Sequence, residues 1–309
     1  MTNDAETAPF QFFSLQVDRT RRLGPSLVRV TFAGDDLAGD HLKGFASGGR
    51  DQSLSLFLPH PGQDAPVLPP LDDPDAYPDM YAVLGAYRAM PHDVRAVMRS
   101  YTVRAQRTAP DGRTEVDIDF AVHADGGPAC RWAQRAEPGD RVVVLGPAVA
   151  DNTGVRFRLP DDADSVLIWG DETALPAASA ILEWLPAGTR AHVYLDVPHS
   201  GDRMELATEA DATVTWLVRE EGAPSAVEAV AGAGLPGADP YVWIAGESGA
   251  VKALRRHFVR ERGLDRRRVT FVGYWRKGLS EDALREVPDE TETDAQADAQ
   301  TDAPAAAAA

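Results

Sequence analysis

The chain has 309 residues, of which 44% are hydrophobic and 26% charged, which suits about two globular domains and excludes wholesale disorder. No apolar run approaches the roughly 20 residues of a membrane-spanning helix, and the first residues lack the basic and apolar regions of a secretory signal. The single cysteine, Cys130, excludes a disulfide framework and a cysteine-ligated iron–sulfur cluster, so we expect a cytoplasmic protein.

The charge of the chain is acidic overall and uneven along the sequence. The formal net charge is −17, which argues against nucleic acid as a partner. Residues 280–309 carry nine acids and one arginine, whereas residues 252–277 carry ten basic residues and two acids. An anionic partner can therefore still be met at a local basic patch.

The N-terminal half has the pattern of a small antiparallel barrel. Residues 1–9 are read as a disordered N-terminus, and residues 10–160 as one β domain. Short runs rich in Val, Phe, Thr and Leu, separated by Gly, Pro and Asp, predict six strands. They are FQFFSLQVD, LVRVTFAG, LSLFLP, MRSYTVRAQ, TEVDIDFAVH and RVVVLGP. Residues 72–98 interrupt the series with a Pro- and Tyr-rich stretch that is partly helical.

Residues 161–279 alternate apolar strands with helical segments, which predicts a parallel sheet covered by helices on both faces. The sequence GAGLPG at 232–237 matches a dinucleotide-binding fingerprint in letters alone, because a helical segment precedes it and a strand follows. The acidic, Ala-rich residues 280–309 have almost no apolar side chains to bury, so we predict a disordered tail.

Two motifs in the barrel could hold a flavin nucleotide. In RSYT at 99–102, strand alternation puts Arg99 and Tyr101 on one face, where they could meet a pyrophosphate and stack on a ring. An ordinary exposed strand explains these four residues equally well. In HADGGPACRWAQRA at 123–136, a Gly-rich turn leads into a helix that begins at Pro128, with Arg131 nearby. That arrangement is either a phosphate cradle or a simple strand–turn–helix connection.

Three motifs in the second half follow strands of the predicted parallel sheet. GDETALPAA at 170–178 and AGESGAV at 245–251 stand where such sheets bind ligands, although a capped helix start explains the first as well. YWRKG at 274–278 puts Arg276 and Lys277 beside an aromatic pair, and a solvated basic edge is the alternative. The histidines show no metal-ligand spacing, so we expect no protein-bound metal.

Taken in order, these motifs resemble one family, the siderophore-interacting proteins or ferric-siderophore reductases, which are flavoproteins related to the ferredoxin reductases. The similarity runs from about Phe10 to Gly278. It is carried by VMRSYTVR at 97–104, DIDFAVHADGGPACRWA at 117–133, GDRVVVLGP at 139–147, WGDETALPAASAILEWLP at 169–186, VTWLVREEGAPS at 214–225 and the stretch 242–278.

The resemblance implies an N-terminal FAD-binding barrel and a C-terminal nucleotide-binding domain of ferredoxin-reductase type. It also implies a set of cofactor-binding residues in this chain and no catalytic acid or base, because the flavin carries the electrons. The cofactor-binding residues are Arg99, Tyr101, Thr102, Asp119, His123, Gly127, Pro128, Ala129, Trp132, Asp171, Thr173 and Ala174.

One stretch departs from the family. Relatives often carry D-x-H-x-K-L before the Pro-rich insertion, with the lysine in a basic patch that faces the siderophore. Here Ser53 and Ser55 take the places of the histidine and the lysine. The cations that we expect to substitute in substrate binding are Arg50, Arg131, Arg276 and Lys277.

The expected function is reduction of Fe(III) in a siderophore complex by NAD(P)H or reduced ferredoxin through FAD. The alternatives are a general NAD(P)H:flavin or ferredoxin-linked reductase, and a non-catalytic flavin- or siderophore-binding protein. We expect a monomer that contacts neither nucleic acid nor membrane. Asp196, near the end of the second strand, slightly favours NADH as the donor, while Arg203 could receive the extra phosphate of NADPH.

Overall fold

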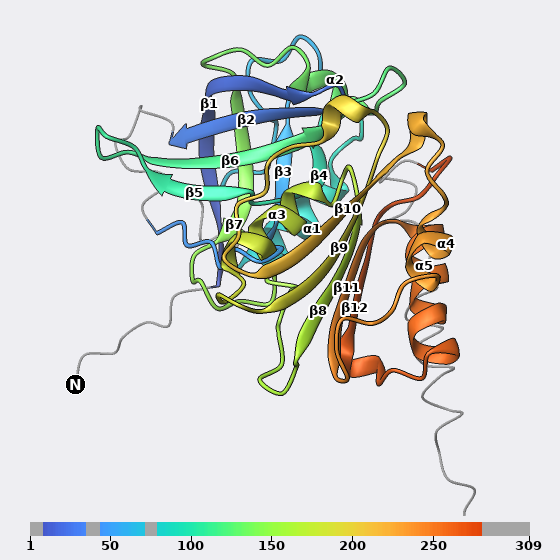
Figure 1. The fold of residues 1–309 in the computed structure, drawn as a ribbon. Helices are drawn as coiled ribbons and strands as arrows, with labels where there is room; N and C mark the ends of the chain where they lie inside the picture. The colour runs from blue at the N-terminus through green and yellow to red at the C-terminus, as the bar shows by residue number, and fades with distance from the viewer. Residues whose placement is uncertain (1–8, 35–43, 72–78, 280–309) are drawn as a thin grey trace, which may run out of the picture.

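The computed structural model describes residues 9–34, 44–71 and 79–279, and two sheets dominate it (Figure 1). The acidic tail, and all but Pro9 of the expected loose N-terminus, lie outside the described residues. Within these ranges no helix is long and apolar enough to cross a membrane.

The N-terminal sheet is antiparallel throughout and curls into an open barrel, which confirms the predicted fold class. Alternate residues point inward, so that Leu15, Phe32 and Ile118 pack together in a core almost closed to solvent. The strands are β1 (Phe10–Gly24), β2 (Leu27–Gly34), β3 (Ser53–Leu58), β4 (Val97–Thr102), β5 (Ala105–Thr108), β6 (Thr114–Ala121) and β7 (Arg141–Pro147), in the order β4-β3-β7-β1-β2-β6-β5.

The barrel sheet has seven strands, whereas the sequence pattern predicted six. The expected strand MRSYTVRAQ divides into β4, at one edge of the sheet, and β5, at the other edge. The chain crosses between the edges at Val103 and Arg104. The Val103 N–H bonds to the Gln52 carbonyl at 2.8 Å, and the Arg104 N–H bonds to the Asp117 carbonyl at 2.9 Å. The two neighbouring N–H groups thus bond to strands at opposite ends of the sheet order, which holds the two sides of the barrel close together.

The stretch expected to be partly helical contains α1 (Met80–Ala89) on the outside of the barrel. Asp79 caps this helix by accepting a hydrogen bond from the Ala82 N–H. Tyr87 turns inward, packs edge-on against Phe57 and donates to the Ala96 carbonyl at 2.7 Å. The helix thereby fixes the chain that leads into β4.

The second sheet is parallel, in the order β10-β9-β8-β11-β12, as predicted. Its strands are β8 (Ser165–Asp171), β9 (Arg190–Val197), β10 (Asp211–Val218), β11 (Pro240–Glu247) and β12 (Val269–Trp275). GAGLPG 232–237 lies between a helix and β11, which confirms that it is not a fingerprint loop.

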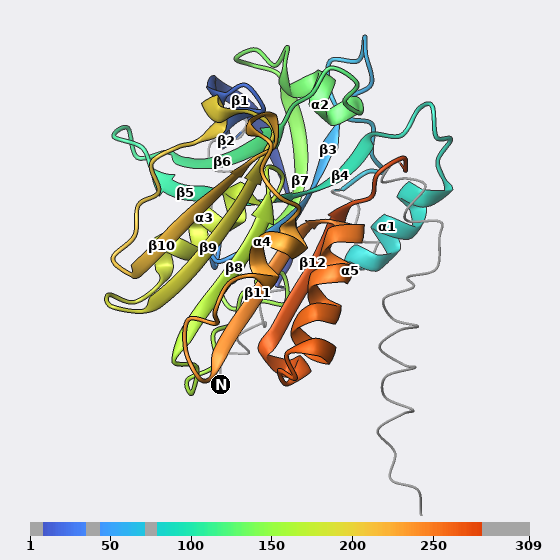
Figure 2. The ribbon, with the colours of Figure 1, turned by 45° about the vertical axis from the view of Figure 1, so that its right-hand side comes forward.

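Helices cover both faces of the parallel sheet (Figure 2). The face toward the barrel carries α3 (Leu175–Trp184), and the other carries α4 (Ala226–Ala231) and α5 (Ser248–Arg256). One turn of π-helix, η3 (His257–Glu261), continues α5. The short 3-10 turns are η1 (Ser200–Asp202), η2 (Arg219–Glu221) and η4 (Arg266–Arg268).

The two sheets share a packed interface that contains one fully buried carboxyl group. Phe157, in the segment that joins the sheets, packs on Trp184 of α3 and on Tyr241 of β11. Asp51, just before β3, is 0% exposed and accepts a hydrogen bond from the Trp243 indole of β11 at 3.1 Å. A side chain of the barrel is therefore anchored inside the second domain.

Candidate functional site

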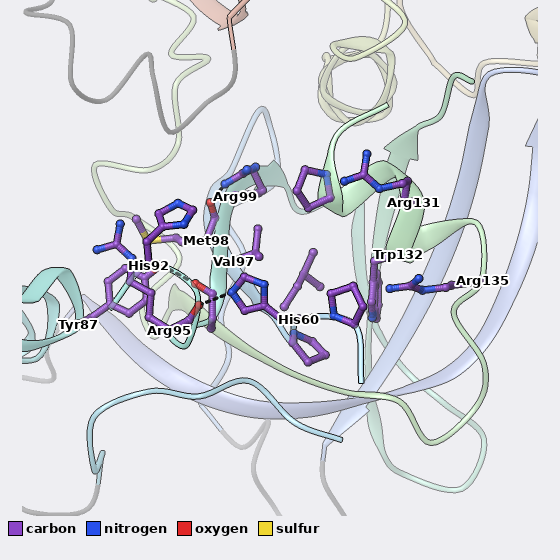
Figure 3. A pocket seen from close by; sticks show the side chains of 15 residues that line it. His60, Tyr87, His92, Arg95, Val97, Met98, Arg99, Arg131, Trp132 and Arg135 are labelled. Atoms are coloured by element: carbon purple, nitrogen blue, oxygen red, sulfur yellow. Dashed lines mark hydrogen bonds between the residues drawn. The ribbon is translucent and has the colours of Figure 1, made fainter. Parts of the chain in front are cut away.

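A cavity of about 160 Å³ opens on the barrel between β4 and α2 (Pro128–Ala133). Figure 3 shows His60 near its middle, with Arg95 and His92 on one side and Trp132 and Arg135 on the other.

The cavity is built for an anion. Its charged residues are the four arginines Arg95, Arg99, Arg131 and Arg135, and none of the 15 residues that line it is acidic. Arg131 donates to the Gly126 carbonyl at 2.6 Å, and Arg95 donates to the Arg88 carbonyl at 2.9 Å. Because a carbonyl oxygen bears no net charge, these bonds orient the guanidinium groups without neutralising them.

A second cavity of about 450 Å³ adjoins the first and shares His60, Trp132 and Arg135 with it. It continues along the barrel to Arg141, at the start of β7. Unlike the first cavity, it is lined by two acidic residues, Asp64 and Asp140, as well as by arginines. The positive charge is therefore concentrated in the first cavity.

The three residues singled out in RSYT lie on two faces of β4, as alternation requires. Arg99 lines the cavity and is 8% exposed. The ring of Tyr101 lies 4.4 Å from that of Phe120, and the side chain remains partly exposed. Thr102 points the other way, toward the second domain, where it hydrogen-bonds to Tyr274 of β12. The strand thus reaches both the cavity and the packed interface with the second domain.

The turn before α2 is tight because it contains Gly126. A Cβ atom there would lie 2.0 Å from the Cys130 sulfur and 3.0 Å from the His123 carbonyl oxygen. The lone cysteine is part of this turn, since its sulfur contacts both the N–H and the carbonyl of His123. Around Gly127, in contrast, a Cβ would meet nothing within 4 Å, which leaves room beside the cavity.

Several expected cofactor contacts occupy distinct positions around this turn. Pro128 and Trp132 line the cavity, whereas Ala129 is buried in the barrel core. Trp132 stacks on Phe32 and is only 4% exposed. The α2 helix has six residues, so its dipole is small, and Arg131 in the helix and Arg135 after it supply most of the positive charge.

Asp119 and His123, two of the expected cofactor residues, do not line the cavity. Asp119 lies on the outer face of β6, where Arg29 binds it at 2.6 and 2.8 Å. On the same face, burial opposes the charged form of Asp117, but Arg107, the Thr31 hydroxyl and Arg29 together keep the pKa of Asp117 low. His123 is exposed beyond the end of β6. The role of Asp119 and His123 in cofactor binding stays a prediction.

In the second domain, Asp171 joins the carboxyl ends of three strands. Its carboxylate accepts bonds from the Thr173 N–H and hydroxyl, from the Glu247 N–H at 2.8 Å and from the Trp275 indole at 2.7 Å. Burial, and then the charge of Glu172, raise the pKa of Asp171 to about 6. Thr173 and Ala174 lead into α3 from this point, so these residues shape the edge of the sheet.

The four expected substrate cations fall in three places. Arg276 and Lys277 lie at the carboxyl edge of the parallel sheet, directly after β12. Arg131 belongs to the barrel cavity. Arg50 stacks over Trp184, at the end of α3. Because α3 runs back from the carboxyl edge, Arg50 is at the opposite edge and is not brought together with Arg276.

The site of the family lysine is occupied by hydroxyl groups. Ser55 on β3 pairs opposite Ser100 on β4, and Ser53 pairs opposite Thr102. By strand alternation all four side chains are on the face that Thr102 presents to the second domain. This face therefore offers neutral hydrogen-bonding groups instead of a cation.

The two residues considered for donor recognition are both in ion pairs. Asp196 accepts from Arg219 at 2.8 Å, and Arg219 also binds Glu172 at 2.8 Å. Arg203 pairs with Glu221 at 2.6 Å. A nucleotide phosphate would therefore compete with a carboxylate for either arginine.

The sequence reading missed half of the cavity and the buried link between the domains. His60, His92 and Arg95 belong to no motif that the sequence analysis identifies, although His92 and Arg95 lie shortly before RSYT. Arg135 lies within the motif at 123–136 but is not distinguished there from its neighbours. Asp51 accepts a hydrogen bond from Trp243, which is 192 positions away in the sequence, so no local sequence pattern predicts the contact.

Comparison with known proteins defines the class. A family model described as the siderophore-interacting FAD-binding domain matches residues 16–151, and one described as the siderophore-interacting protein matches residues 163–278. The protein thus combines a siderophore-interacting FAD-binding domain with a siderophore-interacting C-terminal domain. The chain belongs to the siderophore-interacting protein family.

Similar proteins support the same assignment over nearly the whole chain. Ferric vibriobactin reductase ViuB of Vibrio cholerae is 30% identical over 87% of this chain and 90% of its own length. The NADPH-dependent ferric-chelate reductase of Escherichia coli is 31% identical over 86% and 93%. The structure of the siderophore-interacting protein SipS from Aeromonas hydrophila matches with a TM-score of 0.70 and 32% identity, covering 92% of this chain and 99% of that one.

Proposed function

We propose that this protein is an FAD-dependent ferric-siderophore reductase, which takes electrons from NAD(P)H and reduces Fe(III) in a siderophore complex so that iron leaves as Fe(II). The observation that carries the proposal is the arginine-lined, acid-free cavity beside β4, whose strand also reaches the interface with the parallel-sheet domain. This supports binding of an anionic dinucleotide to the barrel, next to a domain whose parallel sheet could bind the reductant at its carboxyl edge.

The residues divide the work between the two domains. Arg99 and Arg131 would bind the pyrophosphate of FAD, and Tyr101 would cover one face of its ring. FAD supplies the chemistry of accepting two electrons from a nicotinamide and passing them on singly. Asp171 fixes the edge of the second domain by joining β8, β11 and β12, so that a docked nicotinamide would meet a rigid surface.

Arg276 and Lys277 would meet the ferric complex at the same edge. Many ferric siderophores are anionic, and a local cationic pair raises their encounter rate although the whole molecule is acidic. Because NAD(P)H is the electron donor in this proposal, we expect the protein to act in the cytoplasm. Reduced ferredoxin as an alternative donor, and a monomeric state, stay predictions.

An anaerobic assay tests the proposal. The purified protein should be yellow, lose that colour on addition of NADH or NADPH, and then release Fe(II) from a ferric siderophore to a ferrous chelator. Bleaching without Fe(II) release from any of a panel of siderophores would indicate a general flavin reductase. A colourless protein that takes up no FAD would overturn the proposal.

A further inference from the structure

A strongly basic surface lies along α5 and the two turns that follow it. It runs from Lys252 in α5 through η3 to Arg268 in η4, and we call it the basic surface. These 17 residues include eight lysines and arginines against two acids, so their net charge is +6. Six of the eight cations are exposed, while Arg255 and Arg268 are half-buried. No residue of this surface has a part in the proposed function.

The ion pairs of the basic surface leave most of its positive charge in place. Asp265 pairs with Arg267 at 2.6 Å, and Asp162, before β8, pairs with Arg268. Glu261 lies 3.9 Å from the nearest guanidinium group. Together with the eight cations, these three acids bring the sum of the charges to +5. The surface therefore attracts an acidic partner.

The basic surface begins beside the point where the chain leaves the described fold. Figure 2 shows α5 alongside β12. Ser248, the first residue of α5, donates to the Trp275 carbonyl at the end of β12, at 2.8 Å. The last described residue, Leu279, turns back there, since its N–H bonds to the Arg276 carbonyl at 3.1 Å. Lys252 is one helical turn from Ser248, about 6 Å along the helix.

The sequence that follows Leu279 carries the opposite charge. Residues 280–309 include nine acids and one arginine, and seven of the acids fall within residues 281–294. We call residues 281–294 the acidic segment. Fully extended, it spans at most about 50 Å, whereas α5 and η3 together are roughly 20 Å long. The acidic segment is thus long enough to reach every cation of the basic surface.

The relief of the basic surface also suits this segment. A cavity of about 430 Å³ opens between η3 and η4. It is lined by Val259, Asp265, Arg266 and Arg267. The cavity thus offers a half-buried apolar side chain beside two cations. The acidic segment has the matching composition, because Leu284 and Val287 stand among its acids.

We propose that the acidic segment 281–294 binds to the basic surface of its own chain. The inference goes beyond the proposed function and does not depend on it. Because the segment is tethered beside the surface, its effective concentration there is about 1 mM. A dissociation constant of about 0.1 mM then keeps it bound about nine-tenths of the time. Binding through charge needs no folded structure in the segment, so it agrees with the disorder predicted from the composition.

Binding of the acidic segment has one consequence for the rest of the molecule. The segment covers the cations of α5 and of the turns after it. Other polyanions then reach this surface only by displacing the segment. The most basic stretch of the chain is thereby closed to nonspecific anionic partners, in keeping with the acidic character of the whole molecule.

The test places a nitroxide spin label on the acidic segment of the full chain. Thr291→Cys provides the labelling site, because the single native cysteine, Cys130, is buried. At about 10 mM salt, the label should broaden the amide NMR signals of residues 252–268 and leave those of the turn 109–113 sharp. At about 1 M salt the broadening should disappear, since screening shortens the range of charge interactions from about 30 Å to about 3 Å.

Two triple variants with equal changes of charge localise the interaction. The first removes three exposed cations of the basic surface through Lys252→Gln, Arg256→Gln and Arg260→Gln. The control removes three exposed cations elsewhere through Arg21→Gln, Arg158→Gln and Arg190→Gln. We expect the first to weaken binding about tenfold or more, so that the bound fraction falls to about half or less. The control should retain the broadening of the wild type.

A change in the acidic segment itself keeps the test decisive if the first triple variant does not fold. Glu286→Gln, Glu290→Gln and Glu292→Gln alter only the segment, and they should reduce the broadening to a similar extent. A mixture of spin-labelled protein with isotope-labelled protein that lacks the spin label detects binding between copies. The signals of the isotope-labelled copy should stay sharp in this mixture.

The remaining outcomes overturn the proposal. Sharp signals for residues 252–268 at about 10 mM salt would show that the segment does not bind there. Equal broadening in the two triple variants, or broadening confined to another region, would show that it covers a different surface. Broadening in the mixture would show that the segment binds a second copy of the chain. None of these measurements depends on FAD or substrate, so each leaves the proposed function untouched.

Discussion

Trp275 and Asp171 tie the last strand of the parallel sheet to its first. The indole Nε1 of Trp275 donates to the Asp171 carboxylate at 2.7 Å, and the N–H of Glu247, on the strand between them, donates to the same oxygen at 2.8 Å. Gly246 makes this approach feasible, because a Cβ there would lie 2.5 Å from the carboxylate. One buried side chain thus sets the shape of the nucleotide-facing edge.

Asp171→Asn should destabilise the protein although the side chain keeps its size. The amide can accept at one oxygen only, so its NH₂ group would face either the donors of Glu247 and Trp275 or the N–H of Thr173. Leaving buried donors unsatisfied costs about 1–3 kcal/mol. Urea unfolding of the FAD-free protein measures this loss, with the exposed Asp161→Asn as control. Equal stability of the two variants would contradict the role given to Asp171.

Arg99→Ala should weaken FAD binding. Loss of a charge-assisted hydrogen bond to the pyrophosphate is worth about 1.5–3 kcal/mol, or roughly 10–150-fold in affinity. Arg131→Ala, on the opposite wall of the cavity, should have a similar effect. Fluorescence titration of the FAD-free proteins gives the affinities, and the exposed Arg190→Ala is the control. If both cavity variants bind FAD with unchanged affinity, the pyrophosphate does not bind in this cavity.

The sequence predicts the two-domain architecture well because its signals are local. Strand alternation, Gly and Pro punctuation and the strand–helix rhythm each act over a few residues. The same alternation also explains why Asp119 lies on the face of β6 away from the core. Glu115, Asp117 and Asp119 share one face of β6, while Val116, Ile118 and Phe120 fill the core on the other. The acidic side chains of this face form ion pairs with arginines of neighbouring strands, and the sequence alone does not predict those pairs.

The site is less predictable, because its parts come together through tertiary contacts. RSYT and the Gly-rich turn are visible as motifs, but the cavity also needs His60 after β3 and Arg95 before β4. Arg50 shows the converse. It adjoins Asp51 in the chain, yet the left-handed backbone at both positions turns its side chain to Trp184. Charge type alone did not reveal which cations share a surface.

Replacing Arg276 and Lys277 together by Ser should slow reduction of an anionic ferric siderophore and flatten its dependence on salt. Exposed charges act through attraction that salt screens, so the effect should shrink at high ionic strength. NAD(P)H-driven bleaching of the flavin should change less. Arg50→Gln is the matched control, because Arg50 lies at the other edge of the sheet. Equal slowing by Arg50→Gln would instead support its expected place in the substrate site.

Asp51 should make the stability of the protein depend on pH. Its folded pKa is raised from 3.8 to about 6 by burial, so its contribution is fully present below pH 3.8 and is lost as the pH rises through 6. The shift amounts to about 3 kcal/mol. Relative to Asp51→Asn, the unfolding free energy of the wild type should therefore fall between pH 4 and pH 7. Asp171 titrates in both proteins and cancels. A constant difference would contradict the raised pKa.

The preference for NADPH over NADH should change when one of two arginines, Arg219 or Arg203, loses a carboxylate partner. Asp196 holds Arg219 at the end of β10, and Glu221 holds Arg203. Asp196→Asn removes one of the two carboxylates that hold Arg219, so that the arginine, still paired with Glu172, has more positive charge available for the 2′-phosphate of NADPH. Glu221→Gln does the same for Arg203. We expect Asp196→Asn to raise the ratio of the NADPH to the NADH reduction rate by about tenfold, since a charge-assisted bond is worth about 1.5–3 kcal/mol.

Stopped-flow reduction of bound FAD by each nucleotide gives these ratios directly. A rise in Asp196→Asn alone identifies Arg219 as the phosphate-binding residue, because Asp196 lies at the carboxyl edge with Asp171 and pairs with it across β8 and β9. A rise in Glu221→Gln alone would assign the phosphate to Arg203, which pairs farther along the chain after η1. If neither ratio changes, neither arginine receives the phosphate, and discrimination between the donors must arise elsewhere on the domain.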